Sequence, residues 1–219
     1  MAGYDNQRCN SPVTPQRIGD RTMFLVSDAC ERNKGPILEV LATELANSRR
    51  VVEIGSGTGQ HAVHFATGLP HLTWQPTDRR EYLASLAART AEEGAANLRE
   101  PLELDVNQDP WPELEGDVVY SANTLHIMSW PEVESFFDGI GRILATDGLL
   151  VIYGPFCYQG KFTSESNARF DLSLRQRDPL SGIRDVEALD RLAGDQGLER
   201  VADYSMPANN QLLIWKRVR

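Results

Sequence analysis

The chain has 219 residues, of which 41% are hydrophobic and 24% are charged, and its formal net charge is −9. This length suits one domain, and no stretch is apolar for long enough to span a membrane, so no membrane partner is expected. The acidic balance lacks a clustered Lys/Arg run, which argues against DNA or other nucleic acid as a partner. The polar N-terminus, residues 1–10, has no apolar signal segment, and we expect a cytoplasmic protein.

Three cysteines bound the redox and metal chemistry. Cys9, Cys30 and Cys157 are odd in number and lack CxxC spacing. This predicts reduced thiols, with neither a disulfide framework nor a metal site.

Predicted helices and strands alternate along most of the chain. After a loosely ordered lead-in, residues 1–26, Ser27 or Asp28 can cap a helix that reaches about Asn47, and Pro36 predicts a break inside it. The later helices are expected over 59–67, 80–93, 131–144 and 186–196. The strands are expected over 50–54, 72–76, 102–104, 118–121, 148–153, 198–204 and 211–216. This order predicts an α/β, Rossmann-like fold with a mostly parallel seven-stranded sheet, helices on both faces and an antiparallel last strand.

One segment, residues 154–184, does not follow the alternation. It separates the fifth strand from the next helix by about thirty residues, and connections of that length in a compact domain are usually functional or disordered. We interpret it as an inserted lid or substrate segment of a single domain over residues 1–219.

A glycine-rich turn gives the strongest local signal. It follows a buried strand, opens a helix and reads EIGSGTGQH from Glu53. Glycines permit a sharp turn and let a ligand approach bare backbone, and the helix N-terminus offers unpaired N–H groups. A dinucleotide site would need Gly or Ala at position 60, where this chain has Gln. The turn instead resembles the E-x-G-x-G-x-G pattern of class I S-adenosylmethionine methyltransferases. The alternative is a tight turn without a ligand.

Under the methyltransferase hypothesis, several side chains around this turn are candidate cofactor-binding residues. Asp78 follows the second strand, where a carboxylate can accept ribose hydroxyls; its alternative role is a helix N-cap. Asp105 and Val106 follow the third strand, where the pattern places an acid near the adenine amino group; the alternative is a plain loop acid. The buried carboxylate of Glu53 needs a partner, and the ammonium of the donor is a candidate. The candidates in the turn itself are Glu53, Gly55, Ser56, Gly57, Gly59 and His61.

The end of the fourth strand carries the candidate catalytic residues. Ligands of open α/β sheets bind outside the carboxyl ends of the strands. The segment after Ser121 reads ANTLHIMSW, unlike the Asn/Asp-Pro-Pro-Tyr/Phe of enzymes that methylate DNA bases, and it resembles small-molecule methyltransferases. Asn123 is assigned to both cofactor and catalysis, and His126 to base catalysis or substrate orientation; a packed histidine is the alternative. Tyr153, at the end of the fifth strand, is the third candidate.

Several motifs together resemble one family over about residues 29–216. They are ERNK at 31–34, the glycine turn, NTLHIMSW at 123–130, GPF at 154–156, and the segment 167–184, NARFDLSLRQRDPLSGIR. The chain is similar to the small methyltransferase-like family long labelled as a domain of unknown function, found in bacteria and animals. That resemblance implies the class I fold and S-adenosyl-L-methionine as cofactor, and it supplies no settled substrate.

The same resemblance implies roles for the flanking segments. Asn33, with Arg32, is expected to reach the cofactor site from the N-terminal arm; a helix-start cap is the alternative. The lid would offer apolar walls to a substrate through Tyr153, Phe156, Tyr158 and Phe170. A carboxylate or phosphate clamp would come from Arg175, Arg177 and Arg184, unless these pair with Asp171, Asp178 and Asp185.

Together the motifs predict methyl transfer from S-adenosylmethionine to a small-molecule acceptor by in-line displacement. Because the donor carries an activated group, holding the two reactants aligned supplies most of the effect, on the order of 7–11 kcal/mol, and a catalytic base is optional. The alternatives are a protein or RNA methyltransferase, a donor-binding module without catalysis, and a nicotinamide oxidoreductase. The sequence leaves the oligomeric state open.

Overall fold

The computed structural model describes residues 16–18, 21–24 and 26–218. The chain forms two compact units, residues 1–105 (unit 1) and 106–219 (unit 2). In unit 1, two short strands, β1 (Gln16–Ile18) and β2 (Arg21–Met23), pair as an antiparallel hairpin. They belong to the segment that the sequence analysis interprets as a loosely ordered lead-in. Residues 1–15, 19–20 and 25 of that segment lie outside the described residues.

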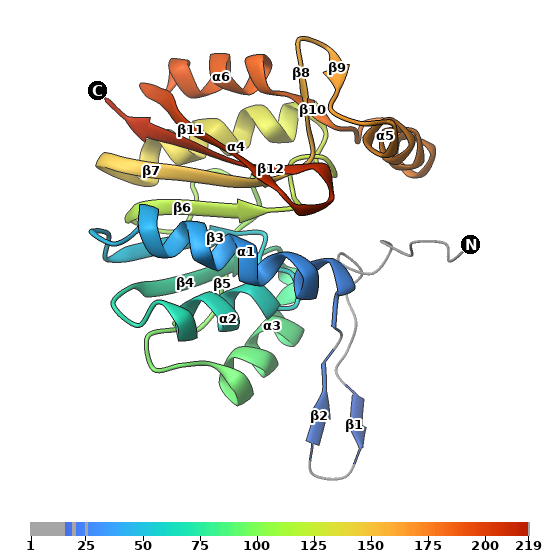
Figure 1. Ribbon diagram of the computed structural model, residues 1–219. Helices are drawn as coiled ribbons and strands as arrows, with labels where there is room; N and C mark the ends of the chain where they lie inside the picture. The colour runs from blue at the N-terminus through green and yellow to red at the C-terminus, as the bar shows by residue number, and fades with distance from the viewer. Residues whose placement is uncertain (1–15, 19–20, 25, 219) are drawn as a thin grey trace. The chain divides into compact units, whose positions relative to one another are not determined.

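Unit 1 contains three parallel strands in the order β3-β4-β5, connected by helices (Figure 1). The helix α2 contacts α1 on one side and α3 on the other. Trp74 and Phe65 are fully buried between strand and helix, with ring centroids 5.6 Å apart. The elements are α1 (Asp28–Glu44), β3 (Arg50–Ile54), α2 (Gln60–Gly68), β4 (Thr73–Asp78), α3 (Arg80–Glu93) and β5 (Leu102–Glu103).

The first helix, α1, corrects one prediction. Ser27 caps it as expected, accepting a hydrogen bond from the Cys30 amide at 3.3 Å, but Pro36 lies inside a continuous helix. A proline normally clashes with a Cβ on the preceding helical residue, and that residue is Gly35, which has none. The carbonyl of Arg32 loses its helical partner on an exposed turn, where water can replace it.

Unit 2 contains four strands in the order β11-β12-β7-β6 (Figure 1). β6 and β7 are parallel, and β12 runs antiparallel to both of its neighbours, β7 and β11. Phe136 and Phe137 of α4 and Trp215 of β12 are fully buried, and the rings of Phe137 and Trp215 are in contact. The elements are β6 (Gly116–Ala122), α4 (Trp130–Ile143), β7 (Leu144–Gly154), α6 (Val186–Asp195), β11 (Leu198–Met206), the short 3-10 helix η1 (Pro207–Asn209) and β12 (Asn210–Arg217).

Residues 154–184, which the alternation left unassigned, are ordered in the structure. A small sheet in the order β10-β8-β9 accompanies one helix, α5. The buried positions of α5 are Asn167, Asp171 and Leu174, so two of the three inward side chains are polar and hide the helical periodicity of the sequence. The elements are β8 (Phe156–Tyr158), β9 (Lys161–Phe162), α5 (Glu165–Arg177) and β10 (Arg184–Asp185).

The predicted fold class is confirmed. Each of the seven strands expected from the sequence forms, three in unit 1 and four in unit 2, mostly parallel and with the last strand antiparallel. These strands and the helices that connect them form a Rossmann-like α/β fold. Over the described part of the chain, no helix combines the length and apolarity needed to span a membrane.

Candidate functional site

The glycine turn of unit 1 adopts a backbone that requires glycine. Gly55, Gly57 and Gly59 have φ values of 77°, 57° and 78°, in the left-handed region that side chains with a Cβ rarely occupy. The amides of Gly55 and Ser56 both donate to the carbonyl of Thr77, at 3.1 and 3.0 Å. The turn is therefore fixed against the end of β4, with its backbone free of bulky side chains at alternate positions.

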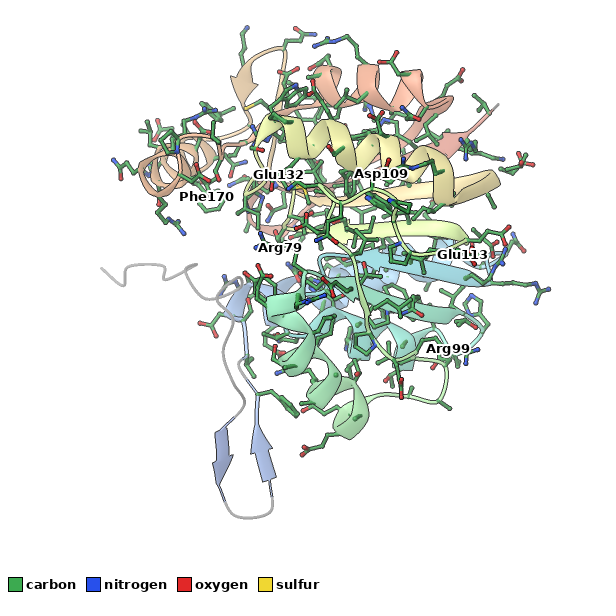
Figure 2. All side chains as sticks on the ribbon, turned by 180° about the vertical axis from the view of Figure 1, so that it is seen from behind. Arg79, Arg99, Asp109, Glu113, Glu132 and Phe170 are labelled. Atoms are coloured by element: carbon green, nitrogen blue, oxygen red, sulfur yellow. The ribbon has the colours of Figure 1, made fainter. Side chains whose placement is uncertain are left out.

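Asp78 lies against this turn. One carboxylate oxygen accepts from the Gly57 amide at 2.6 Å, and the other accepts from the amide of Arg79, which Figure 2 labels, at 2.7 Å. These two N–H groups use two of the roughly four acceptor positions of a carboxylate. Burial raises the pKa of Asp78 to about 6, and the two amides oppose this shift. The predicted proximity of Asp78 to the turn is present in the geometry, and its role as a cofactor ligand stays a prediction.

Glu53, on β3, has an internal partner that the sequence analysis did not anticipate. Its carboxylate accepts a hydrogen bond from the indole N–H of Trp74 at 2.8 Å, and it also bonds to Ser56. Burial nevertheless raises the pKa of Glu53 to about 7, and the nearby charge of Asp78 adds to the shift. A cationic group near Glu53 would favour its ionised form, as the hypothesis of an ammonium partner requires.

Two helices of unit 1 meet beside the turn through polar side chains. His61, at the start of α2, shares a 2.7 Å hydrogen bond with the amide oxygen of Asn33 on α1, so the described contacts bring these two predicted residues together. Desolvation lowers the pKa of His61 to about 3 and keeps the ring neutral. The neighbouring Gln60 is a buried residue that the sequence analysis missed; it accepts from the Ser27 amide at 2.9 Å and donates to Glu31 at 2.5 Å. The sequence signal that could have pointed to Gln60 is its position directly after the glycine turn, at the start of the predicted helix.

The remaining candidates of the cofactor set occupy the predicted positions along the chain. Asp105 and Val106 are separated from the end of β5 by Leu104 and are both half-buried, and Arg32 is exposed on α1. Their contacts to a cofactor remain predictions.

In unit 2, Asn123 and Tyr153 share a hydrogen bond after β6. Asn123 has a φ of 59°, and its amide donates to the carbonyl of Tyr153 at 2.9 Å. Asparagine tolerates this left-handed conformation better than other side chains, and such strained positions concentrate at functional sites. Tyr153 is buried in β7. The two residues thus lie together at the carboxyl ends of β6 and β7, and their catalytic roles stay predictions.

His126 lies in the loop between β6 and α4. The residue is buried, and within the described residues nothing hydrogen-bonds to either nitrogen of its ring. Desolvation lowers the pKa of His126 to about 4, and the positive charges of Arg184 and Arg177 act in the same direction. At neutral pH the ring is therefore uncharged, with one nitrogen available as an acceptor.

The predicted apolar walls are only partly brought together. Phe170, which Figure 2 labels on α5, packs edge-on against His126 with ring centroids 5.4 Å apart, and Phe156 is buried. Tyr158 instead donates its hydroxyl to Asp203 of β11 at 2.8 Å. Phe170 thus neighbours the candidate base, whereas Tyr158 is held by a surface acid.

The three predicted clamp arginines have partners inside unit 2. Arg175 pairs with Asp171 at 2.7 Å, which is the alternative that the sequence left open for it. Arg177 bonds to Ser173, and Arg184 binds backbone carbonyls. In the described part of the chain, the three arginines therefore do not converge on one anion site. Their role as substrate ligands stays a prediction.

The family model described as "Protein of unknown function (DUF938)" matches residues 25–217. The chain belongs to the DUF938 family. This confirms the resemblance read from the motifs, which extends from ERNK to the last strand.

Solved structures similar to this DUF938 chain share its fold. An O-methyltransferase family protein from Burkholderia thailandensis matches with a TM-score of 0.74 and 20% identity, over 87% of this chain and 57% of that one. An O-methyltransferase family 2 protein from Planctomyces limnophilus in complex with apigenin gives 0.69 and 18%, over 84% and 62%. Human N-acetylserotonin methyltransferase in complex with SAM gives 0.67 and 15%, over 86% and 58%. The chain thus spans less than two thirds of each of these proteins.

Proposed function

We propose that this protein binds S-adenosylmethionine through unit 1 and transfers the methyl group to a hydroxyl oxygen of a small molecule. The observation that carries the proposal is the glycine turn with the Asp78 carboxylate bonded to its Gly57 amide at 2.6 Å. This pair leaves bare backbone and an acid with free acceptor capacity side by side, which suits a nucleoside with two ribose hydroxyls. The similar structures named above, which include a SAM complex, support the same cofactor.

When bound, S-adenosylmethionine supplies an activated methyl group on a sulfonium. The residues of unit 1 would hold it: Asp78 would accept hydrogen bonds from the ribose, and the backbone of residues 55–59 would contact the donor. Glu53 would give up its proton on binding, because a nearby positive charge stabilises the carboxylate. None of these residues changes covalently.

The hydroxyl acceptor is inferred from unit 2. An alcohol or phenol reaches the enzyme with a proton that must leave as the new bond to carbon forms. His126 is neutral, and among the described residues nothing hydrogen-bonds to its ring nitrogens, so it can take that proton. An amine acceptor fits less well, because the positive charges of Arg184 and Arg177 act at His126 and would repel a cation. Two of the structures named above are described as O-methyltransferases, one of them in complex with apigenin, which agrees with this inference.

Isothermal titration with S-adenosylmethionine and with S-adenosylhomocysteine tests the cofactor. We expect saturable heat from both and none from NAD(H). Absence of heat and of any thermal shift at millimolar donor would overturn the proposal.

Radiolabelled donor, incubated with fractions of a cell extract, tests the acceptor. Label in the low-molecular-weight fraction is expected, and label in protein or RNA would replace the small-molecule assignment. The His126→Gln variant should bind donor as the wild type does and turn over about 10²- to 10⁴-fold more slowly. Donor binding without turnover in every fraction would indicate a binding module.

A further inference from the structure

Four consecutive carbonyls around His126 are held by one segment that is distant in sequence. The carbonyl of Leu125 accepts from Arg184 Nε at 3.0 Å, and that of His126 accepts from the Gly182 amide at 2.9 Å. The carbonyl of Ile127 accepts from the Ser181 hydroxyl at 3.0 Å, and that of Met128 accepts from Arg184 Nη2. The loop 125–128 therefore has its backbone fixed residue by residue by the segment 181–184.

This segment is itself fixed to α5. One carboxylate oxygen of Asp171 accepts from the Ile183 amide at 2.8 Å, and the other pairs with Arg175. Gly182 has a φ of 155°, where a side chain would be strained, and a Cβ there would lie 2.5 Å from Arg175 Nη2 and 3.0 Å from Asp171 Oδ1. Since α5 also carries Phe170 against the ring of His126, the backbone and one face of the histidine depend on the same connected group of residues.

The charge of Arg184 is costly where it stands. Its side chain is buried, and among the described residues no carboxylate forms an ion pair with it; backbone carbonyls of residues 125, 128 and 180 take its hydrogen bonds. Burying a charge without an ionic partner is unfavourable. A charge kept under these conditions suggests a role that a neutral side chain would not fill.

We propose that Arg184, assisted by Ser181 and Gly182, is a positioning residue for His126 and acts through the carbonyls of residues 125–128. The planar guanidinium spans two carbonyls three residues apart, which fixes the turn of the loop and therefore the direction of the His126 ring. A role of Arg184 in catalysis rests on the proposed function, whereas its effect on the position of the His126 ring does not. The pKa direction agrees with it, because the Arg184 charge contributes to lowering the pKa of His126.

Titration of the histidine ring signals by NMR tests this without donor or acceptor. The chain has four histidines, and His126→Gln assigns the signal of interest. We expect Arg184→Met to raise the pKa of His126, because a nearby positive charge is removed. Arg184→Lys should keep the pKa close to that of the wild type and shift the ring signal, because an ammonium keeps the charge and loses the two-pronged contact. Arg191→Met, an exposed arginine of α6, is the matched control and should change neither.

Turnover with the extract fraction that accepts the methyl group gives the second measurement. Arg184→Lys should lower kcat by about 10- to 100-fold with little change in the KM for donor, as expected for a misplaced catalytic group. A folded Arg184→Met protein in which His126 titrates as in the wild type would overturn the proposal. If Arg184→Met does not fold, Arg184→Lys and Ser181→Ala decide: wild-type ring signals in both would overturn it. If the protein does not bind the donor, the proposed function fails, but the NMR titration still tests the positioning role of Arg184. The two proposals can therefore be contradicted separately.

Discussion

Both units bury a histidine beside their candidate functional loops, but unit 1 adds two buried carboxylates and unit 2 adds a buried arginine. In unit 1, Glu53 and Asp78 are carboxylates whose pKa values burial raises, to about 7 and about 6. In unit 2, Arg184 and His126 are basic groups whose pKa values burial lowers. Each unit thus holds groups whose charged form is disfavoured until a ligand of suitable charge arrives.

The difference indicates which ligand each unit suits. Buried acids gain from a ligand that carries positive charge and hydroxyl donors, as a sulfonium nucleoside with an ammonium does. A neutral histidine can accept a proton from a ligand, and the nearby positive charges stabilise the negative charge that the ligand then develops. Under the proposed function, this difference agrees with a donor bound by unit 1 and a proton-losing acceptor bound by unit 2, and substitutions in either unit can break it.

The largest expected effect concerns Glu53 and pH. Because its folded pKa lies near 7, above the ordinary value of 4.5, the folded protein holds this proton more tightly than the unfolded chain. The stabilisation that protonated Glu53 gives the folded protein is therefore complete below pH 4.5 and is lost as the pH rises to about 7. The loss amounts to about 3 kcal/mol of unfolding free energy. Glu53→Gln keeps an acceptor for the Trp74 indole and should remove this slope in urea unfolding followed by tryptophan fluorescence between pH 4 and 8, a range chosen to bracket that window.

A ligand that carries an ammonium group should change the same measurement. Saturating S-adenosylhomocysteine keeps the amino-acid ammonium of the donor and should flatten the wild-type slope, because it stabilises the Glu53 carboxylate. Parallel pH curves for wild type and Glu53→Gln would contradict the assignment of the slope to this residue.

The next effect concerns the ribose contact of Asp78. Asp78→Asn places an amide where the carboxylate accepts from two backbone N–H groups, and it also weakens acceptance from the ribose. We expect donor affinity to fall by about 30- to 100-fold, or about 2–3 kcal/mol, in isothermal titration.

Asp171→Asn in unit 2 is the matched control, because Asp171 is also a buried aspartate that accepts a backbone N–H. It should lower thermal stability and leave donor affinity unchanged. Equal losses of affinity in the two variants would break the assignment of the donor to unit 1.

These two aspartates also show how far the sequence could predict the site. Asp78 was predicted from its distance to a glycine motif, because strand, turn and next strand end form one local unit with a fixed geometry. The Asp171–Ile183 bond and the contacts of Arg184 depend on the packing of α5, which the sequence did not reveal because Asn167 and Asp171 occupy its inward face. The fold was predictable from apolar strands, whereas Pro36 was misleading because Gly35 before it has no Cβ with which the proline ring would clash.

Gly59→Ala tests the turn of unit 1 with a smaller effect. Gly59 has a φ of 78°, and a Cβ there would lie 2.7 Å from the Leu86 side chain. A left-handed residue with a side chain costs about 1–2 kcal/mol, and the methyl group also requires Leu86 to move. We expect a destabilisation of about 2 kcal/mol in urea unfolding and weaker donor binding. A stable variant with unchanged affinity would show that the turn is not under the ligand.

The smallest effect comes from a glycine of unit 2, and it has the opposite sign. Gly194 lies in α6 with a φ outside the left-handed region, and a Cβ there would meet nothing within 4 Å. Gly194→Ala should therefore stabilise the protein by about 0.5–1 kcal/mol, because alanine loses less backbone entropy in a helix. Urea unfolding measures the gain, and donor affinity should stay at the wild-type value. A loss of stability instead would mean that α6 needs the flexibility of glycine near its end. In that case Gly194 would be required for conformation as Gly59 is, and the contrast between the two glycines would no longer hold.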